Sequence, residues 1–142
     1  MKAILNRFKK TILPVLMCFF TLLSCDTGEP EIKHDFPFEL KVMPVPKDIA
    51  NHSTVEIRIN IEREDSYSGA AYFIRYFQFD GLGTLQYYDE QPYLPNDLYP
   101  LKAKEFRLFY TSQSVVSQYF EVWISDNFGN EKQLSFQFNS TD

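Results

Sequence analysis

An all-β fold is predicted for this chain, namely an immunoglobulin-like antiparallel β-sandwich of about seven strands. Three observations support this prediction. Apolar and polar residues alternate with a period of two, turn-forming residues separate the alternating segments, and no segment shows sustained helical periodicity. Seven short strands in one small domain are typical of an immunoglobulin-like sandwich. With 44% hydrophobic and 17% aromatic residues among 142, the chain has enough apolar mass for a core, which excludes global disorder.

The N-terminal residues 1–24 are predicted to be a lipoprotein signal peptide. Four basic residues within the first ten precede the uncharged segment 11–23, which is too short for a membrane span of about 20 residues and matches a secretory signal. The sequence Leu22-Leu23-Ser24-Cys25 resembles the lipobox of bacterial lipoproteins. Cys25 is therefore the predicted lipidation site and mature N-terminus. A plain signal peptide with a chance cysteine and a retained membrane helix are the alternatives.

Cleavage before Cys25 changes the charge and the cysteine content of the protein. It leaves 10 Lys and Arg against 19 Asp and Glu, a net charge of −9. An acidic domain is repelled by nucleic acid and by anionic lipid, so we expect no direct nucleic-acid binding, and the acyl groups must supply the anchor. Cys18 leaves with the signal, so no disulfide is expected. Residues 25–35 are a predicted tether, and residues 36–140 form the predicted domain.

The predicted strands follow from the alternation and are separated by turns. They cover residues 36–42, 55–62, 71–79, 84–88, 106–111, 120–125 and 134–139. Segment 71–79 is aromatic on both faces, which predicts a central strand. Residues 80–83, Asp-Gly-Leu-Gly, are predicted to be a hairpin turn rather than a phosphate cradle, because a strand and not a helix follows. Residues 126–130 are predicted to form the turn of the last hairpin.

No catalytic or metal-binding constellation is found in the sequence. The adjacent carboxylates at 64–65 and 89–90 lie in predicted turns, where solvated acids are usual. His34 and His52 lie in or beside predicted loops, and no G-x-S-x-G motif occurs. The oxygens of the 126–130 turn are too few for the six to eight ligands of calcium, although calcium binding is retained as an alternative. The prediction is a protein that is not an enzyme and has no cofactor or metal.

One long connection is the candidate binding site. Residues 87–101 contain four Tyr, three Leu and three Pro, and long connections without regular structure are often functional. The candidate partner-binding residues in it are Tyr93, Asp97, Leu98 and Tyr99, because tyrosine in a proline-stiffened loop offers contact area at low entropic cost. The alternative is a loop that packs over one end of the sandwich, with Leu94 and Leu101 as its pins.

Five sequence blocks, in order along the chain, resemble the TraQ family of Bacteroidetes conjugative transposons. They are residues 42–47, 74–85, 94–101, 106–112 and 126–129. The resemblance also includes the signal and the lipobox. It implies an immunoglobulin-like fold, a part in conjugal DNA transfer at the cell envelope, and other envelope proteins of the conjugation apparatus as partners. The family carries no established catalytic residues.

Two functions are compatible with these predictions. The preferred hypothesis is a non-enzymatic, lipid-anchored component of the conjugation apparatus that acts through protein–protein interaction, on the periplasmic or the surface side of a membrane that the sequence does not specify. It predicts an exposed apolar patch or an unprotected sheet edge. The alternative is a surface lipoprotein that binds glycan through exposed aromatic residues. It predicts coplanar exposed rings with Asp, Asn or Arg beside them.

Overall fold

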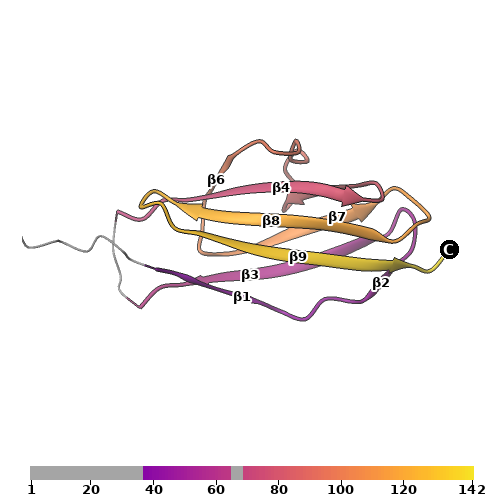
Figure 1. The fold of residues 1–142 in the computed structure, drawn as a ribbon, viewed down its shortest axis with the longest axis horizontal. Helices are drawn as coiled ribbons and strands as arrows, with labels where there is room; N and C mark the ends of the chain where they lie inside the picture. The colour runs from indigo at the N-terminus through magenta and orange to yellow at the C-terminus, as the bar shows by residue number, and fades with distance from the viewer. Residues whose placement is uncertain (1–36, 65–68) are drawn as a thin grey trace, which may run out of the picture. The chain divides into compact units, whose positions relative to one another are not determined.

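Two β-sheets face each other in the computed structural model, which describes residues 37–64 and 69–142 (Figure 1). The first sheet contains β1 (Glu39–Val42), β3 (Thr54–Glu62), β7 (Glu105–Ser112) and β5 (Gly83–Tyr87), in that order. The second contains β2 (Asp48–Ile49), β9 (Glu131–Ser140), β8 (Gln118–Asp126), β4 (Tyr72–Asp80) and β6 (Tyr99–Leu101). All pairs are antiparallel except β2 with β9.

The strand order confirms the predicted immunoglobulin-like sandwich. The orders β1-β3-β7-β5 and β9-β8-β4 correspond to the two sheets of a constant-type immunoglobulin domain. Two strands were not predicted, β2 with two residues and β6 with three. Both are too short to show a period of two, so the sequence pattern cannot reveal them.

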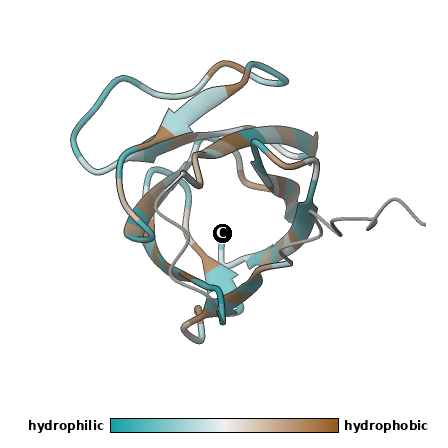
Figure 2. Ribbon diagram, turned by 90° about the vertical axis from the view of Figure 1, so that its left-hand side faces the viewer, coloured by the Kyte–Doolittle hydropathy of each residue, from teal (hydrophilic) through white to brown (hydrophobic). Residues whose placement is uncertain are grey.

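The core follows from the alternation of residue types along the strands. In β3, Val55, Ile57 and Ile59 point inward, and the residues between them are less buried. Inward residues of β8 face them from the other sheet, including Phe120, which stacks on Tyr110 with 4.3 Å between ring centroids. Figure 2 looks along the strands and shows hydrophobic and hydrophilic residues alternating along the ribbons. The two sheets therefore share one apolar layer.

Residues 80–83 form a corner between the sheets and not the predicted hairpin turn. β4 lies in the second sheet and β5 in the first, so the chain crosses from one layer to the other. Gly81 has a φ of 73°, which glycine adopts without strain. A Cβ at Gly83 would overlap the ring of Tyr110, so glycine allows that ring to pack against the backbone. Turn chemistry alone does not distinguish a corner from a hairpin.

The prediction of a central strand at 71–79 holds on one side only. β8 pairs with β4 along its whole length, from Tyr72 to Asp80. On the other side β6 pairs only with Tyr72, Phe73 and Ile74. Beyond Ile74, β4 is therefore an edge strand, and it lies on the same side of the sandwich as the edge strand β5.

The predicted signal peptide, Cys25, the tether and His34 lie outside the described residues. None of the described residues forms a helix long and apolar enough to cross a membrane. The described domain begins at Pro37, at the end of the sandwich that also holds the turn between β8 and β9.

Candidate functional site

The connection between β5 and β7, residues 88–104, closes the open side of the sandwich (top of Figure 1). It leaves the first sheet, pairs with the second through β6, and returns to the first. The backbone N–H of Tyr93 donates to the carbonyl of Leu85 on the edge of β5, at 2.8 Å. The N–H of Asn96 donates to the carbonyl of Tyr76 on the edge of β4, also at 2.8 Å. Both edge strands are thereby partly covered, which protects them from unwanted strand pairing.

Two tyrosines hold this connection against the core. Tyr93 is only 8% exposed and stacks on Tyr99, with 4.5 Å between ring centroids and 26° between ring planes. The hydroxyl of Tyr99 accepts a hydrogen bond from the N–H of Leu94 at 3.0 Å. Burial, with smaller contributions from nearby Glu90, Tyr87 and Tyr99, raises the pKa of Tyr93, so its side chain is neutral. These two rings pin the connection from the inside.

A tight turn projects outward from the pinned segment. The N–H of Asp97 donates to the carbonyl of Leu94 at 3.3 Å, and Asn96 has a φ of 66°. Pro at the second turn position and Asn with positive φ at the third are the residues that a type II turn requires. Leu94 and Leu98, on either side of the turn, are 62% and 58% exposed. We call residues 94–98 the loop tip.

The structure separates the four predicted binding residues into two groups. Asp97 and Leu98 lie exposed on the loop tip, whereas Tyr93 is buried and Tyr99 half-buried. Tyr93 therefore offers no free area to a partner in this conformation. The alternative prediction, in which the Leu94 side chain holds the loop against the core, is wrong for Leu94 because this residue is 62% exposed. Leu101 does pack against the core.

A second group of exposed apolar side chains lies at the far end of the sandwich from Pro37. Leu82 at the corner is 64% exposed, and Val115 and Val116 in the turn between β7 and β8 are 58% and 55% exposed. The two connections are joined, because the N–H of Gln113 donates to the carbonyl of Leu82 at 2.8 Å. These side chains make a useful comparison for the loop tip, since they are similarly exposed but lie on different connections.

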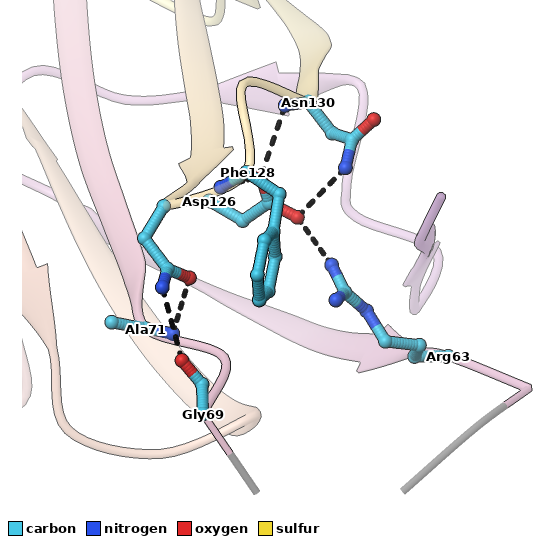
Figure 3. Close-up of polar contacts among 7 residues, drawn as sticks. Arg63, Gly69, Ala71, Asp126, Phe128 and Asn130 are labelled. Atoms are coloured by element: carbon cyan, nitrogen blue, oxygen red, sulfur yellow. Dashed lines mark hydrogen bonds and ion pairs between the residues drawn. The ribbon is translucent and has the colours of Figure 1, made fainter. Parts of the chain in front are cut away.

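A buried ion pair closes the end of the sandwich at which the described domain begins (Figure 3). The guanidinium of Arg63, just after β3, donates to the carboxylate of Asp126 at the end of β8. The side chains are 1% and 0% exposed. The carboxylate also accepts from the backbone N–H groups of Phe128 and Asn130 and from the Asn130 amide, each at 2.9 Å. Asp126 therefore fixes the whole turn between β8 and β9.

The surroundings of this pair keep both charges in place. Phe38, Tyr72 and Phe128 surround the Arg63 guanidinium, whose carbon lies 5.4 to 5.9 Å from the ring centroids, a favourable cation–π arrangement. Burial pulls the pKa of Asp126 upward, but the hydrogen bonds from Asn130, Phe128 and Arg63 outweigh it and hold this pKa below its usual value. The carboxylate is ionised at neutral pH.

This arrangement argues against the calcium alternative at 126–130. The carboxylate oxygens of Asp126 are already engaged by Arg63, Phe128 and Asn130. The Asn127 side chain is used as well, because it bonds to the backbone of Ala71 and Gly69. Within residues 37–64 and 69–142, no group of three or more His, Cys, Asp or Glu is placed to hold a metal ion.

Sequence reasoning missed the Arg63–Asp126 pair, although the pattern contained a signal. Position 63 continues the inward series 55, 57, 59 and 61, and position 126 continues 120, 122 and 124. Opposite charges at the next inward positions of two strands indicate a pair across the sandwich. The predicted strands end at residues 62 and 125, so the alternation was not extended to positions 63 and 126.

These features define an immunoglobulin-like β-sandwich domain whose most exposed apolar side chains lie on the connections between strands. The family model of the TraQ conjugal transfer protein matches residues 9–141. The chain therefore belongs to the TraQ conjugal transfer protein family and is a component of conjugative transfer.

Three solved structures from Bacteroides are similar to this chain. A conjugative transposon lipoprotein from Bacteroides eggerthii is 45% identical, with a TM-score of 0.69, and the match covers 72% of this chain and 97% of that one. A lipoprotein from Bacteroides thetaiotaomicron is 46% identical, with a TM-score of 0.69 over 79% and 86% of the two chains. A conjugate transposon protein from Bacteroides vulgatus is 42% identical, with a TM-score of 0.67 over 79% and 91%. No curated protein matches the chain.

Proposed function

We propose that this protein is a non-enzymatic, lipid-anchored envelope component of the conjugation apparatus that binds another envelope protein through its loop tip. The observation that carries the proposal is the pair of exposed leucines, Leu94 and Leu98, on a turn that is itself pinned to both sheets. Exposed apolar groups on a rigid support are the features of a protein-binding surface. Membership of the TraQ family supports a role for such contacts in conjugative transfer.

The rigidity of the loop tip favours binding. Pro95 and the hydrogen bond within the turn fix the backbone before a partner arrives, so little conformational entropy is lost on association. Full burial of one leucine contributes about 1.5–3 kcal/mol. Asp97 adds an exposed acceptor beside the leucines and can orient the partner through a directional hydrogen bond.

The lipid anchor is the second part of the proposal. Its support is the sequence Leu22-Leu23-Ser24-Cys25 after an apolar segment and the description of two similar structures as lipoproteins. Mass spectrometry of the membrane fraction should find an acylated peptide that begins at Cys25. A free Cys25 thiol in the mature wild-type protein would contradict it. The variant Cys25→Ala should leave the protein unlipidated.

Conjugal transfer tests the loop tip directly. The double variant Leu94→Ser, Leu98→Ser should lower transfer frequency about tenfold or more, because each tenfold corresponds to about 1.4 kcal/mol of lost binding. Its thermal midpoint should stay near that of the wild type, since both side chains are exposed.

The matched control is Val115→Ser, Val116→Ser, which removes similar exposed apolar groups from a different connection. It should transfer at the wild-type frequency. Normal transfer by the loop-tip variant would overturn the proposed site, and reduced transfer by the valine variant alone would place the contact at the far end of the sandwich.

A further inference from the structure

A shallow groove crosses the outer face of the first sheet, away from the loop tip. It has a volume of about 430 Å³ and is lined by Thr54, Gln86, Tyr88, Asp89, Phe109 and Thr111. These residues come from β3, β7 and β5 and from the two positions after β5. The register places Thr111 between Thr54 and Thr84, and Phe109 between Glu56 and Gln86. Because paired strands carry most of the lining, the groove is preformed.

Tyr88 adopts a strained backbone conformation at the wall of this groove. Its φ is 49°, which is rare for a residue with a bulky side chain and is strained. The Gln86 amide donates to the carbonyl of Tyr88 at 2.8 Å and helps to hold this conformation. The ring is 39% exposed and lies 6.5 Å from the Phe109 ring at an angle of 58°. This backbone conformation places the exposed Tyr88 ring at the side of the groove, next to the Phe109 ring on β7.

Polar groups surround the two rings at the same groove. The hydroxyls of Thr54 and Thr111 are 2.8 Å apart and form one hydrogen bond, which leaves acceptor capacity on both oxygens. Asp89 is exposed and adds a carboxylate. Glu56 lies next to Phe109 in the register and is paired with Arg58 and Arg107. The groove therefore combines apolar ring surface with hydroxyl and carboxylate oxygens.

From this combination we infer that the groove binds a neutral carbohydrate chain. The C–H face of a pyranose packs on an aromatic ring, while its hydroxyl groups donate to threonine and carboxylate oxygens. The nearby Asp89 disfavours an anionic ligand. The backbone of β7, which carries Phe109 and Thr111, is already paired on both sides, with β3 and with β5, so an extended peptide cannot join β7 as a strand. The volume falls within the range of small-molecule sites.

The geometry of the groove differs from the one that the glycan hypothesis drawn from the sequence requires. That hypothesis required coplanar exposed rings, whereas Tyr88 and Phe109 are inclined at 58° and form a corner. The cell envelope offers two sources of neutral sugar chains, namely N-acetylated peptidoglycan strands and neutral polysaccharides. The ring-and-hydroxyl chemistry of the groove is common to both, so the experiment must separate them.

Saturation-transfer difference NMR with the full-length protein in detergent tests this site, with triacetylchitotriose and mannotriose as two separate probes. At least one probe should receive saturation from the protein through its C–H protons. Signal with the first probe alone indicates the peptidoglycan type, and signal with the second alone indicates a neutral polysaccharide. No signal with either probe at millimolar concentration would overturn the inference.

Tyr88→Gly is the decisive variant, because glycine adopts the positive φ without strain. It should weaken binding at least about tenfold while the thermal midpoint stays at or above the wild-type value. Val116→Ser, in the turn between β7 and β8, should bind the probe normally. A Tyr88→Gly variant that is destabilised and still binds would assign Tyr88 to packing and overturn the inference. Signal from a proline-rich peptide with none from either sugar would assign the groove to a peptide and also overturn it.

Discussion

Two connections of this sandwich solve the same problem in different ways. The turn between β8 and β9 is short and is organised by one buried carboxylate, Asp126, which binds the turn backbone and Arg63. The connection between β5 and β7 is long and is held by backbone bonds to two sheet edges and by the stacked rings of Tyr93 and Tyr99. We call the contacts between Asp126, Arg63 and the turn backbone the polar lock, and the stacked rings of Tyr93 and Tyr99 the aromatic lock.

The two connections differ in whether they present side chains that the fold itself does not use. In the β8–β9 turn, the polar side chains of Asp126 and Asn127 are turned back onto the protein itself. In the β5–β7 connection, the side chains of Leu94 and Leu98 take no part in the pinning, and both residues remain more than half exposed. Closing a sheet edge does not require exposed leucines. Under the function proposed above, different residues of this one segment serve recognition and stability, and the predictions below test the stability side of that separation.

The largest effect is expected at the polar lock. Asp126→Ala should lower the free energy of unfolding by about 3–5 kcal/mol, because it leaves the Arg63 cation buried without its partner. Arg63→Met keeps much of the volume, and Asp126 retains its bonds from Phe128 and Asn130. The arginine variant should therefore lose less. Chemical denaturation of both variants measures the difference, and an equal or larger loss for Arg63→Met would contradict this account of the turn.

The aromatic lock should be next in magnitude. Tyr93→Ala removes a ring that is 8% exposed and should cost about 3 kcal/mol, as other large-to-small core substitutions do. Tyr99→Ala should cost less, because Tyr99 is half-buried. Hydrogen exchange provides the local measurement: the amides of Tyr93 and Asn96 should lose protection in both variants. If the two amides stay protected in Tyr93→Ala, the backbone bonds alone hold the connection.

Acid should weaken the polar lock and leave the aromatic one unchanged. The pKa of Asp126 in the folded protein is held below its ordinary value of 3.8. The ionised carboxylate therefore stabilises the fold above that value, and this contribution is lost as the pH falls through the lower, folded-state pKa. The stability difference between wild type and Asp126→Asn should be constant near neutral pH and should narrow below pH 3.8. For Tyr93→Phe the corresponding difference should not change over this acidic range.

Sequence predicted the repetitive parts of this fold well and the connections only in part. The β3 alternation identifies its inward residues because one face of the strand is buried. No local sequence signal indicates which side of residues 88–104 faces the core. The binding hypothesis therefore expected Tyr93 on the surface, and its alternative expected Leu94 in the interior. The formation of β6 and of the corner at 80–83 depends on which of the two sheets the next strand joins. Contacts with residues far along the chain determine this. The groove at Tyr88 and Phe109 was missed for the same reason, because it requires the register of three strands.

The smallest effects should come from the left-handed residues of the two connections, Asn96 and Gly129. Their φ values are 66° and 92°, and a Cβ at Gly129 would meet no atom within 4 Å. Alanine at either position should therefore cost only the conformational penalty of about 1–2 kcal/mol, whichever lock holds the connection. Asn96→Gly should be close to neutral, because glycine accepts positive φ. Thermal unfolding of the three variants tests this. A loss at Gly129→Ala as large as that of Asp126→Ala would mean that the polar lock depends on the turn backbone, and that the two connections differ less than their contacts indicate.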